Sequence, residues 1–281
     1  MQLSIGVIFA VLGAALLHAA WNAMVKGSRD VLLDTALIAL GAGVAVLPFL
    51  PFVNAPERAS WPYLGASAVI HIGYFVALVG AYRTGDLSYG YPLMRGVAPL
   101  IVAASALAWF GEAPTPGMWL GVALISLGVL SIGVLGFRWD ARAGAATGWA
   151  LANAAIIAAY TLVDAAGVRA AGGAERYVAW LFVLQSMPFA GIVLWRRGRG
   201  LTDYVARNWH RGLLGGAFSA AAYGIALWAM TRAPVAAVAA LRETSVIFAA
   251  LFGAYVLKEG SVRRRVAGAV IVAAGVVALR S

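Results

Sequence analysis

The chain contains no cysteine and has little charge. The absence of cysteine from its 281 residues excludes disulfide bridges and thiolate metal sites. Only 11% of the residues are charged, whereas a soluble domain of this length carries roughly a quarter. The sequence also lacks a Gly-x-x-x-x-Gly-Lys-Ser/Thr loop, a His-Glu-x-x-His pair and a Gly-x-Ser-x-Gly motif. We therefore expect no bound nucleotide, no metal or other cofactor, and no enzyme active site.

Apolar residues make up 63% of the chain, and they recur in runs separated by short polar breaks. Each run holds about twenty residues, enough for a helix to cross a hydrocarbon core of ~30 Å. The sequence therefore predicts an all-α integral membrane protein embedded in the lipid bilayer, with ten transmembrane helices. The expected spans are approximately 3–25, 32–53, 61–82, 87–110, 117–136, 146–168, 177–195, 212–231, 235–257 and 262–280.

The net charge of +10 is concentrated in the breaks between apolar runs. Cytoplasmic loops of membrane proteins collect Lys and Arg in this way, and no polar segment is long enough to form a nucleic-acid-binding domain. The charge therefore does not predict a nucleic-acid partner. Most of it follows the odd-numbered helices, which places those loops in the cytoplasm and both termini outside.

The two halves of the sequence resemble each other. A shift of 147 residues aligns Arg95 with Arg242, Glu112 with Glu259, Gly121 with Gly268, and Gly128 with Gly275. We read two five-helix repeats, 1–140 and 141–281. Because five is odd, the second repeat enters the membrane from the opposite side. Inverted repeats are typical of secondary transporters, whose substrate site lies near the midplane between the repeats.

The end of each repeat carries a further resemblance. WFGEAPTPGMWLGVALISLGVLSIG closes the first repeat and YVLKEGSVRRRVAGAVIVAAGVVAL closes the second, while HAAWNAMVK lies in the first helix. These stretches resemble the EamA family of the drug/metabolite transporter superfamily. The resemblance implies a ten-helix carrier with a central cavity lined mainly by helices 1, 3, 4, 6, 8 and 9. In overall appearance the chain is similar to the YddG-like amino-acid exporters of bacteria.

Polar and aromatic side chains inside the predicted spans are the candidates for handling a substrate. A central Arg or Asp costs about 2.5–3.5 kcal/mol on insertion scales, so such residues normally face a cavity or a partner. Several candidates are spaced three or four residues apart and therefore share one helix face. The candidate substrate-binding residues are His18, Asn22, His71, Tyr74, Leu78, Tyr82, Tyr91, Arg95, Tyr160, Tyr223 and Arg242. The alternative for His71 and Tyr74 is a structural hydrogen bond between helices.

Two arginines inside apolar stretches, Arg95 and Arg242, allow two interpretations. Either could present its forked donor to a substrate carboxylate. Alternatively, either could form a structural ion pair with Asp164 or Glu243, which are also candidates for carrying a proton. The two prolines on either side of Arg95 predict a kink in helix 4.

The leading hypothesis is a bacterial inner-membrane carrier that exports amino acids, aromatic or neutral, by alternating access. A carrier of the same fold could instead move a purine, a sugar, a phosphorylated compound or a drug. A membrane enzyme or a regulatory subunit is the alternative from another class. Glycines at spacing seven in helices 5 and 10 predict close packing between the repeats, with a homodimer contact as the alternative, so we expect a monomer.

Overall fold

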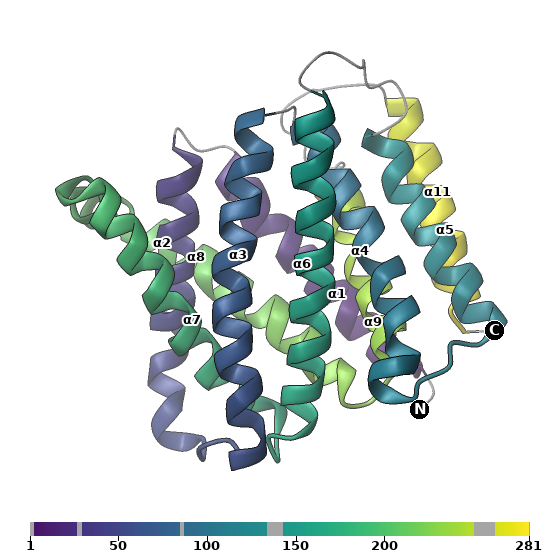
Figure 1. Cartoon of the computed structure of the whole chain (residues 1–281), viewed down its shortest axis with the longest axis horizontal. Helices are drawn as coiled ribbons and strands as arrows, with labels where there is room; N and C mark the ends of the chain where they lie inside the picture. The colour runs from purple at the N-terminus through teal and green to yellow at the C-terminus, as the bar shows by residue number, and fades with distance from the viewer. Residues whose placement is uncertain (1–2, 27–29, 85–86, 134–142, 250–261, 281) are drawn as a thin grey trace.

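The protein is a bundle of long helices, seen in the computed structural model that describes residues 3–26, 30–84, 87–133, 143–249 and 262–280 (Figure 1). No strand occurs among these residues. The helices are α1 (Ile5–Lys26), α2 (Val31–Val46), α3 (Trp61–Thr84), α4 (Leu87–Phe110), α5 (Pro116–Gly133), α6 (Ala143–Arg169), α7 (Ala174–Arg197), α8 (Arg199–Met230), α9 (Val235–Arg242) and α11 (Val262–Ala278). Two short 3₁₀ segments, Leu47–Phe52 and Arg58–Ser60, connect α2 to α3.

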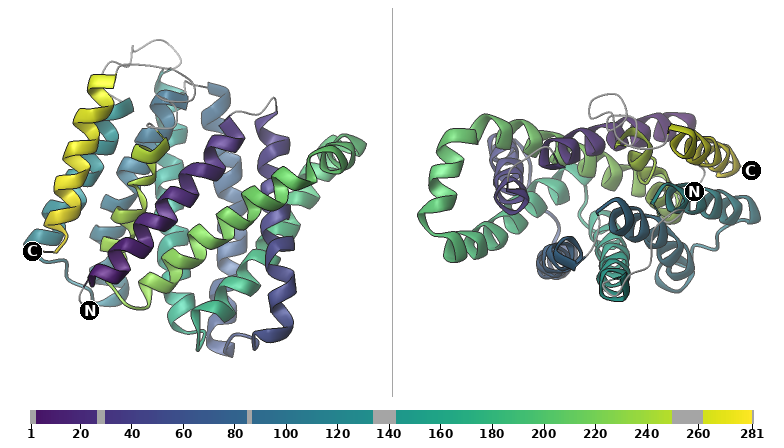
Figure 2. Two further views of the ribbon diagram at one scale, coloured as in Figure 1. Left: turned by 180° about the vertical axis from the view of Figure 1, so that it is seen from behind. Right: turned by 90° about the horizontal axis from the view of Figure 1, so that it is seen from above.

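Eight of the described helices are long and apolar enough to cross a membrane. They correspond to the first eight predicted spans. The ninth predicted span, 235–257, runs into residues 250–261, which lie outside the described residues. The tenth, 262–280, corresponds to α11, whose 17 residues make it shorter than the other eight. Figures 1 and 2 show that α1 begins and α11 ends on the same side of the bundle, as an even number of crossings requires. The predicted all-α transmembrane architecture is confirmed.

The helix packing repeats between the two halves of the chain. Helix α3 of the first half packs against α6 of the second half. Their counterparts do the same, since α8 of the second half packs against α1 of the first. The remaining corresponding pairs face each other directly, since α2 packs on α7 and α5 packs on α11. Figure 2 shows α5 and α11 side by side at one end of the molecule. This exchange of partners is the pattern expected for two structural repeats.

Glycines allow α5 and α11 to approach closely. A Cβ atom added to Gly128 would lie 2.9 Å from the carbonyl oxygen of Gly268, and one added to Gly275 would lie 2.9 Å from that of Gly121. Backbone atoms cannot move aside as a flexible side chain can, so larger residues would separate the helices. The predicted role of these glycines in packing one repeat against the other is confirmed.

The predicted loop over residues 196–211 is wrong for most of its length. After a turn at Gly198, where φ is +52°, α8 runs without interruption into the membrane, and the α7–α8 hairpin projects from one end of the bundle (Figure 1). Asp34 of α2 holds this polar part of α8, because it accepts a hydrogen bond of 2.6 Å from the Tyr204 hydroxyl and lies 3.6 Å from Arg211. The polar composition indicated a loop, but here the helix needs few apolar residues because it leaves the bundle.

The predicted span over 235–257 is interrupted where its arginine lies. The helix α9 ends at Arg242, Glu243 and Thr244 form a turn, and helix resumes over 245–249. By contrast, neither Pro92 nor Pro99 ends α4, which continues as α-helix through both. The break therefore falls in the second repeat, where it places the charged side chains beside the centre of the bundle.

Candidate substrate-binding site

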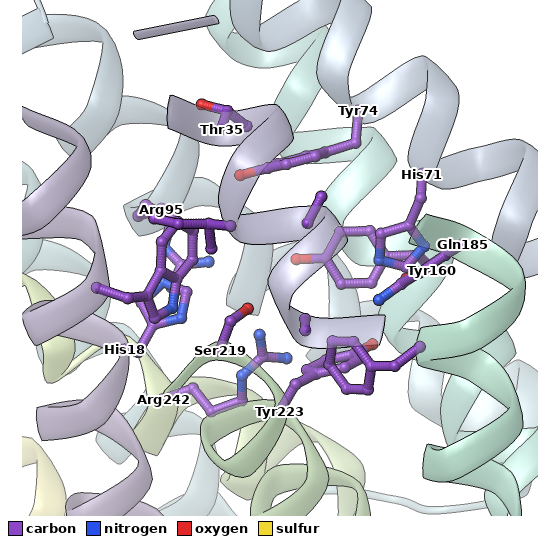
Figure 3. Close-up of a pocket in the computed structure, with 15 residues that line it drawn as sticks. His18, Thr35, His71, Tyr74, Arg95, Tyr160, Gln185, Ser219, Tyr223 and Arg242 are labelled. Carbon is purple, nitrogen blue, oxygen red and sulfur yellow. The ribbon is translucent and has the colours of Figure 1, made fainter. Parts of the chain in front are cut away.

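A cavity lies at the centre of the bundle between the two repeats. The space open to the centre of a water molecule is about 110 Å³. A single water needs roughly 10–15 Å³ by this measure, so the cavity can hold a small organic molecule. Figure 3 shows the side chains that surround it. They are His18, Trp21, Thr35, Ile38, Ala39, Ala42, His71, Tyr74, Arg95, Tyr160, Phe182, Gln185, Ser219, Tyr223 and Arg242.

Arg95 is held by partners on two other helices. Its Nε lies 2.8 Å from Glu243 Oε2, and the side chains of both residues are only 4% exposed. The approach is not aligned along the N–H bond, so the contact is an ion pair and not a hydrogen bond. The Nη2 atom lies 2.9 Å from Nε2 of His18. Guanidinium only donates, so His18 accepts through Nε2 and carries its proton on Nδ1. The structural ion pair is therefore the interpretation that applies to Arg95.

Arg242 has a different environment. It is the last residue of α9 and lines the cavity, and its guanidinium carbon lies 4.8 Å from the ring centroid of Tyr223. Within the described part of the chain, no carboxylate lies within ion-pair distance of Arg242. Its neighbour Glu243 points to Arg95 instead, as adjacent positions about 100° apart on a helix allow. Arg242 is thus the guanidinium that is left for a ligand.

Asp164 is buried behind the cavity wall. It is 0% exposed and accepts hydrogen bonds from the hydroxyls of Tyr177, at 2.8 Å, and Tyr223. Among the described residues Asp164 forms no ion pair with Arg95 or Arg242, so of the two predicted partners only Glu243 pairs with an arginine. Tyr223 links the two charged groups, because its ring contacts Arg242 while its hydroxyl binds Asp164.

Aromatic rings form one wall of the cavity. The rings of His71 and Tyr160 stack with centroids 4.5 Å apart, and Tyr74 and Tyr223 approach Tyr160 edge-on at 5.9 and 6.0 Å. These side chains come from α3, α6 and α8. A contact one helical turn earlier in α3 orients the His71 ring, since its Nδ1 lies 2.9 Å from the carbonyl oxygen of Ser67. The candidate residues of α3 therefore do lie beside those of α6 and α8.

Four of the candidate binding residues are not placed on this cavity. Asn22 donates to the carbonyl oxygen of His18 at 2.8 Å, and Leu78 packs in a separate apolar cluster with residues of α4 and α6. Tyr91 lies beneath Arg95, with its ring centroid 5.9 Å from the guanidinium carbon. The side chain of Tyr82 lies outside the described part of the structure. Spacing along one helix could not distinguish the cavity face from the adjoining core face.

Two helices line the cavity that the sequence did not assign to it. From α2 come Thr35 and three apolar residues, and from α7 come Phe182 and Gln185. Small apolar residues such as those of α2 give no sequence signal that separates a cavity wall from a packed core. Gln185 offered one, because it is an amide in the middle of an apolar span.

A polar network joins the helix ends at one end of the bundle. Arg169 at the end of α6 lies 2.7 Å from Glu112 and donates through Nε to the carbonyl oxygen of Met230 at 2.9 Å. The second carboxylate oxygen of Glu112 accepts from the backbone N–H of Val235, also at 2.9 Å. The network joins the α4–α5 turn, α6 and the α8–α9 turn, so Glu112 connects the two repeats.

Two repeats around a central cavity, with charged side chains on its wall and a helix broken beside it, are typical of secondary transporters. Comparison with known families agrees: the profile of the EamA-like transporter family matches residues 4–134 and again residues 145–281. The chain therefore belongs to the EamA-like transporter family, whose members are transporters of the drug/metabolite type.

The solved structures show the same fold. One crystal structure of a protein that is 15% identical in sequence superposes with a TM-score of 0.72, covering 97% of this chain and 94% of its own. None of the curated proteins compared with the chain matches it.

Proposed function

We propose that this transporter carries amino acids, aromatic or neutral, or closely similar zwitterionic metabolites, and exports them across the bacterial inner membrane. The observation that carries the proposal is the contrast between the two arginines at the cavity. Arg95 is neutralised by Glu243, whereas Arg242 has no carboxylate partner in the described structure and lines the cavity. One available guanidinium suits a substrate with a single carboxylate, which can accept both arms of the fork.

The rest of the cavity supports a substrate with an apolar or aromatic side chain. Tyr74, Tyr160, Tyr223 and Phe182 present rings to the same space, and ring pairs in this arrangement can extend their edge-to-face packing to a bound ring. A phosphorylated compound carries more negative charge, and Arg95 is already engaged. Release on the other side would follow from one repeat rocking against the other around the bound substrate.

The test is counterflow in proteoliposomes with a panel of labelled amino acids. The protein would be compared with Arg242→Gln, with Arg242→Lys, and with Arg207→Gln as a matched control at an exposed arginine of α8. Hydrogen bonds to charged groups contribute about 1.5–3 kcal/mol, so Arg242→Gln should raise the half-saturation concentration by about 10- to 150-fold. Arg242→Lys should give an intermediate half-saturation concentration, because lysine keeps the positive charge but cannot form the paired hydrogen bonds of a guanidinium.

Two results would contradict the proposal. One is a panel in which no amino acid exchanges while the protein remains monodisperse. The other is an Arg242→Gln variant that exchanges amino acids as the Arg207→Gln control does.

A further inference from the structure

The α7–α8 hairpin reaches sideways out of the bundle. Figures 1 and 2 show it extending past α2 and α3, at about the level at which α2 begins. Lipid surrounds a transmembrane bundle on its sides, and the headgroups lie at the level of the helix ends. A hairpin that leaves the side of the bundle near the start of a transmembrane helix therefore lies beside lipid headgroups.

A tryptophan marks the end of the apolar part on each arm of the hairpin. On α7 the exposed Leu194 is followed by Trp195, which is 83% exposed. On α8 Trp209, which is 61% exposed, precedes the exposed Leu213 and Leu214. Tryptophan is enriched at the membrane–water interface, where its amphipathic ring sits at the level of the headgroups. The two rings place the interface at residues 195 and 209, so the segment between them lies at the headgroups.

The segment between the two tryptophans is basic. It contains Arg196, Arg197, Arg199 and Arg207, and its single acidic residue is Asp203. Asp203 lies one turn before Arg207 on the exposed side of α8, so these two charges offset each other. The excess of positive charge therefore falls on the end of α7, beside the first tryptophan.

Two neighbouring arginines at the end of α7 are available to an external anion. The side chain of Arg196 is exposed, and no carboxylate of the described residues lies within ion-pair distance of it. Arg197 lies 3.5 Å from Asp30, yet its side chain is still 49% exposed. Asp30 is also engaged at the start of α2, since it accepts hydrogen bonds of 3.1 Å from the backbone N–H groups of Leu32 and Leu33. Asp30 therefore neutralises this pair of arginines only in part.

We propose that Arg196, Arg197 and the ring of Trp195 form a binding site for the headgroup of an anionic phospholipid. Each guanidinium can donate paired hydrogen bonds to phosphate oxygens, while the exposed indole packs against the lipid beside the headgroup. Basic clusters next to transmembrane helices attract anionic lipids, whereas the cationic group of a zwitterionic lipid offsets its own phosphate. The site lies outside the substrate cavity and does not depend on which substrate is carried.

The test is native mass spectrometry of the purified protein in mixed micelles that contain phosphatidylglycerol and phosphatidylcholine in equal amounts. The variants are Arg196→Gln/Arg197→Gln and Arg196→Lys/Arg197→Lys. The matched control is Arg58→Gln/Arg280→Gln, which removes the same charge at two exposed arginines outside the hairpin. The melting temperature in phosphatidylcholine alone shows that each variant is folded. A further sample with added inorganic phosphate distinguishes a lipid site from a site for a free anion.

The unmodified protein should retain phosphatidylglycerol over phosphatidylcholine at least tenfold. Each arginine near the surface contributes about a fivefold preference, so Arg196→Gln/Arg197→Gln should lower the ratio about tenfold or more. The lysine variant should lose less than threefold, because lysine keeps the positive charge. The ratio for the control should stay within twofold, and inorganic phosphate should not displace the bound lipid.

The site is overturned if the double glutamine variant keeps the preference for phosphatidylglycerol. An equal loss in the control would also overturn it, since the net charge of the protein and not this site would then select the lipid. The same holds if the unmodified protein shows no preference, or if inorganic phosphate abolishes it. None of these results bears on amino-acid counterflow at Arg242, which tests the proposed function separately.

Discussion

Replacement of Glu243 by glutamine tests whether Arg95 has a structural role. The two side chains are each 4% exposed and their atoms lie 2.8 Å apart, so the variant leaves a guanidinium buried without a counter-charge. Removing one partner of a buried ion pair costs about 3–5 kcal/mol. Arg95→Gln should cost a similar amount, because it leaves the carboxylate unpaired and also removes the donor to His18.

The double replacement should cost less than either single one. Once both charges are gone, the remaining loss is the hydrogen bond to His18, a contribution of about 0.5–1.5 kcal/mol. We therefore expect a destabilisation of about 0.5–1.5 kcal/mol for the double variant. The coupling energy should be about 3 kcal/mol or more, the upper end of the range for residues in contact.

The assay is equilibrium unfolding of the purified protein by titration with dodecyl sulfate in mixed micelles. Glu175→Gln is the matched control, because its carboxylate is 65% exposed and lies 3.9 Å from Arg176. That change should stay within about 0.5 kcal/mol. Single replacements at the pair that cost less than about 1 kcal/mol, or a double variant equal to their sum, would refute the structural role of Arg95.

Three further predictions concern the polar network of Arg169, the helix packing and the buried carboxylate. Arg169→Gln should speed amide hydrogen exchange over residues 231–238 at least tenfold, since it removes the ion pair and a backbone contact at that end; unchanged exchange would contradict this. Gly128→Leu should destabilise the protein by about 1–3 kcal/mol through overpacking. Gly6→Leu is the control, because no atom lies within 4 Å of the added Cβ, and equal melting temperatures of the two variants would contradict this prediction. Tyr223→Phe keeps the ring beneath the arginine and removes a donor to the buried carboxylate, so unfolding should become about 1–3 kcal/mol easier with less than a threefold change in half-saturation; the opposite pattern would count against it.

The transmembrane helices were predictable because the length of an apolar run is set by the thickness of the membrane. The start of α8 was not, since its polar first part is held by Asp34, Tyr204 and Arg211, a contact between α2 and α8 that no local pattern reports. The break after Arg242 was also missed. The prolines of α4 were the stronger local signal, yet each removes only one N–H and α4 accommodates both.

The site was predictable where a side chain is costly to bury. Seven of the candidate binding residues line the cavity, namely His18, His71, Tyr74, Arg95, Tyr160, Tyr223 and Arg242. Glu243 was one of two predicted acceptors for an arginine, and the structure pairs it with Arg95. Which of the two arginines stays available to a ligand depends on how α4 and α9 pack, so the sequence could not decide it.

The central claim is that the cavity between the repeats is the path of the substrate. Because the chain has no cysteine, a single one can be introduced at Ser219, which lines the cavity, and another at Leu127, which is 58% exposed on α5, as a control. Both would be treated with a membrane-impermeant thiol reagent in vesicles of each orientation. We expect Ser219→Cys to react, to be protected at least tenfold by a saturating amino acid, and Leu127→Cys to stay unmodified. A Ser219→Cys variant that reacts from neither side, or reacts equally fast with every amino acid present, would contradict the account.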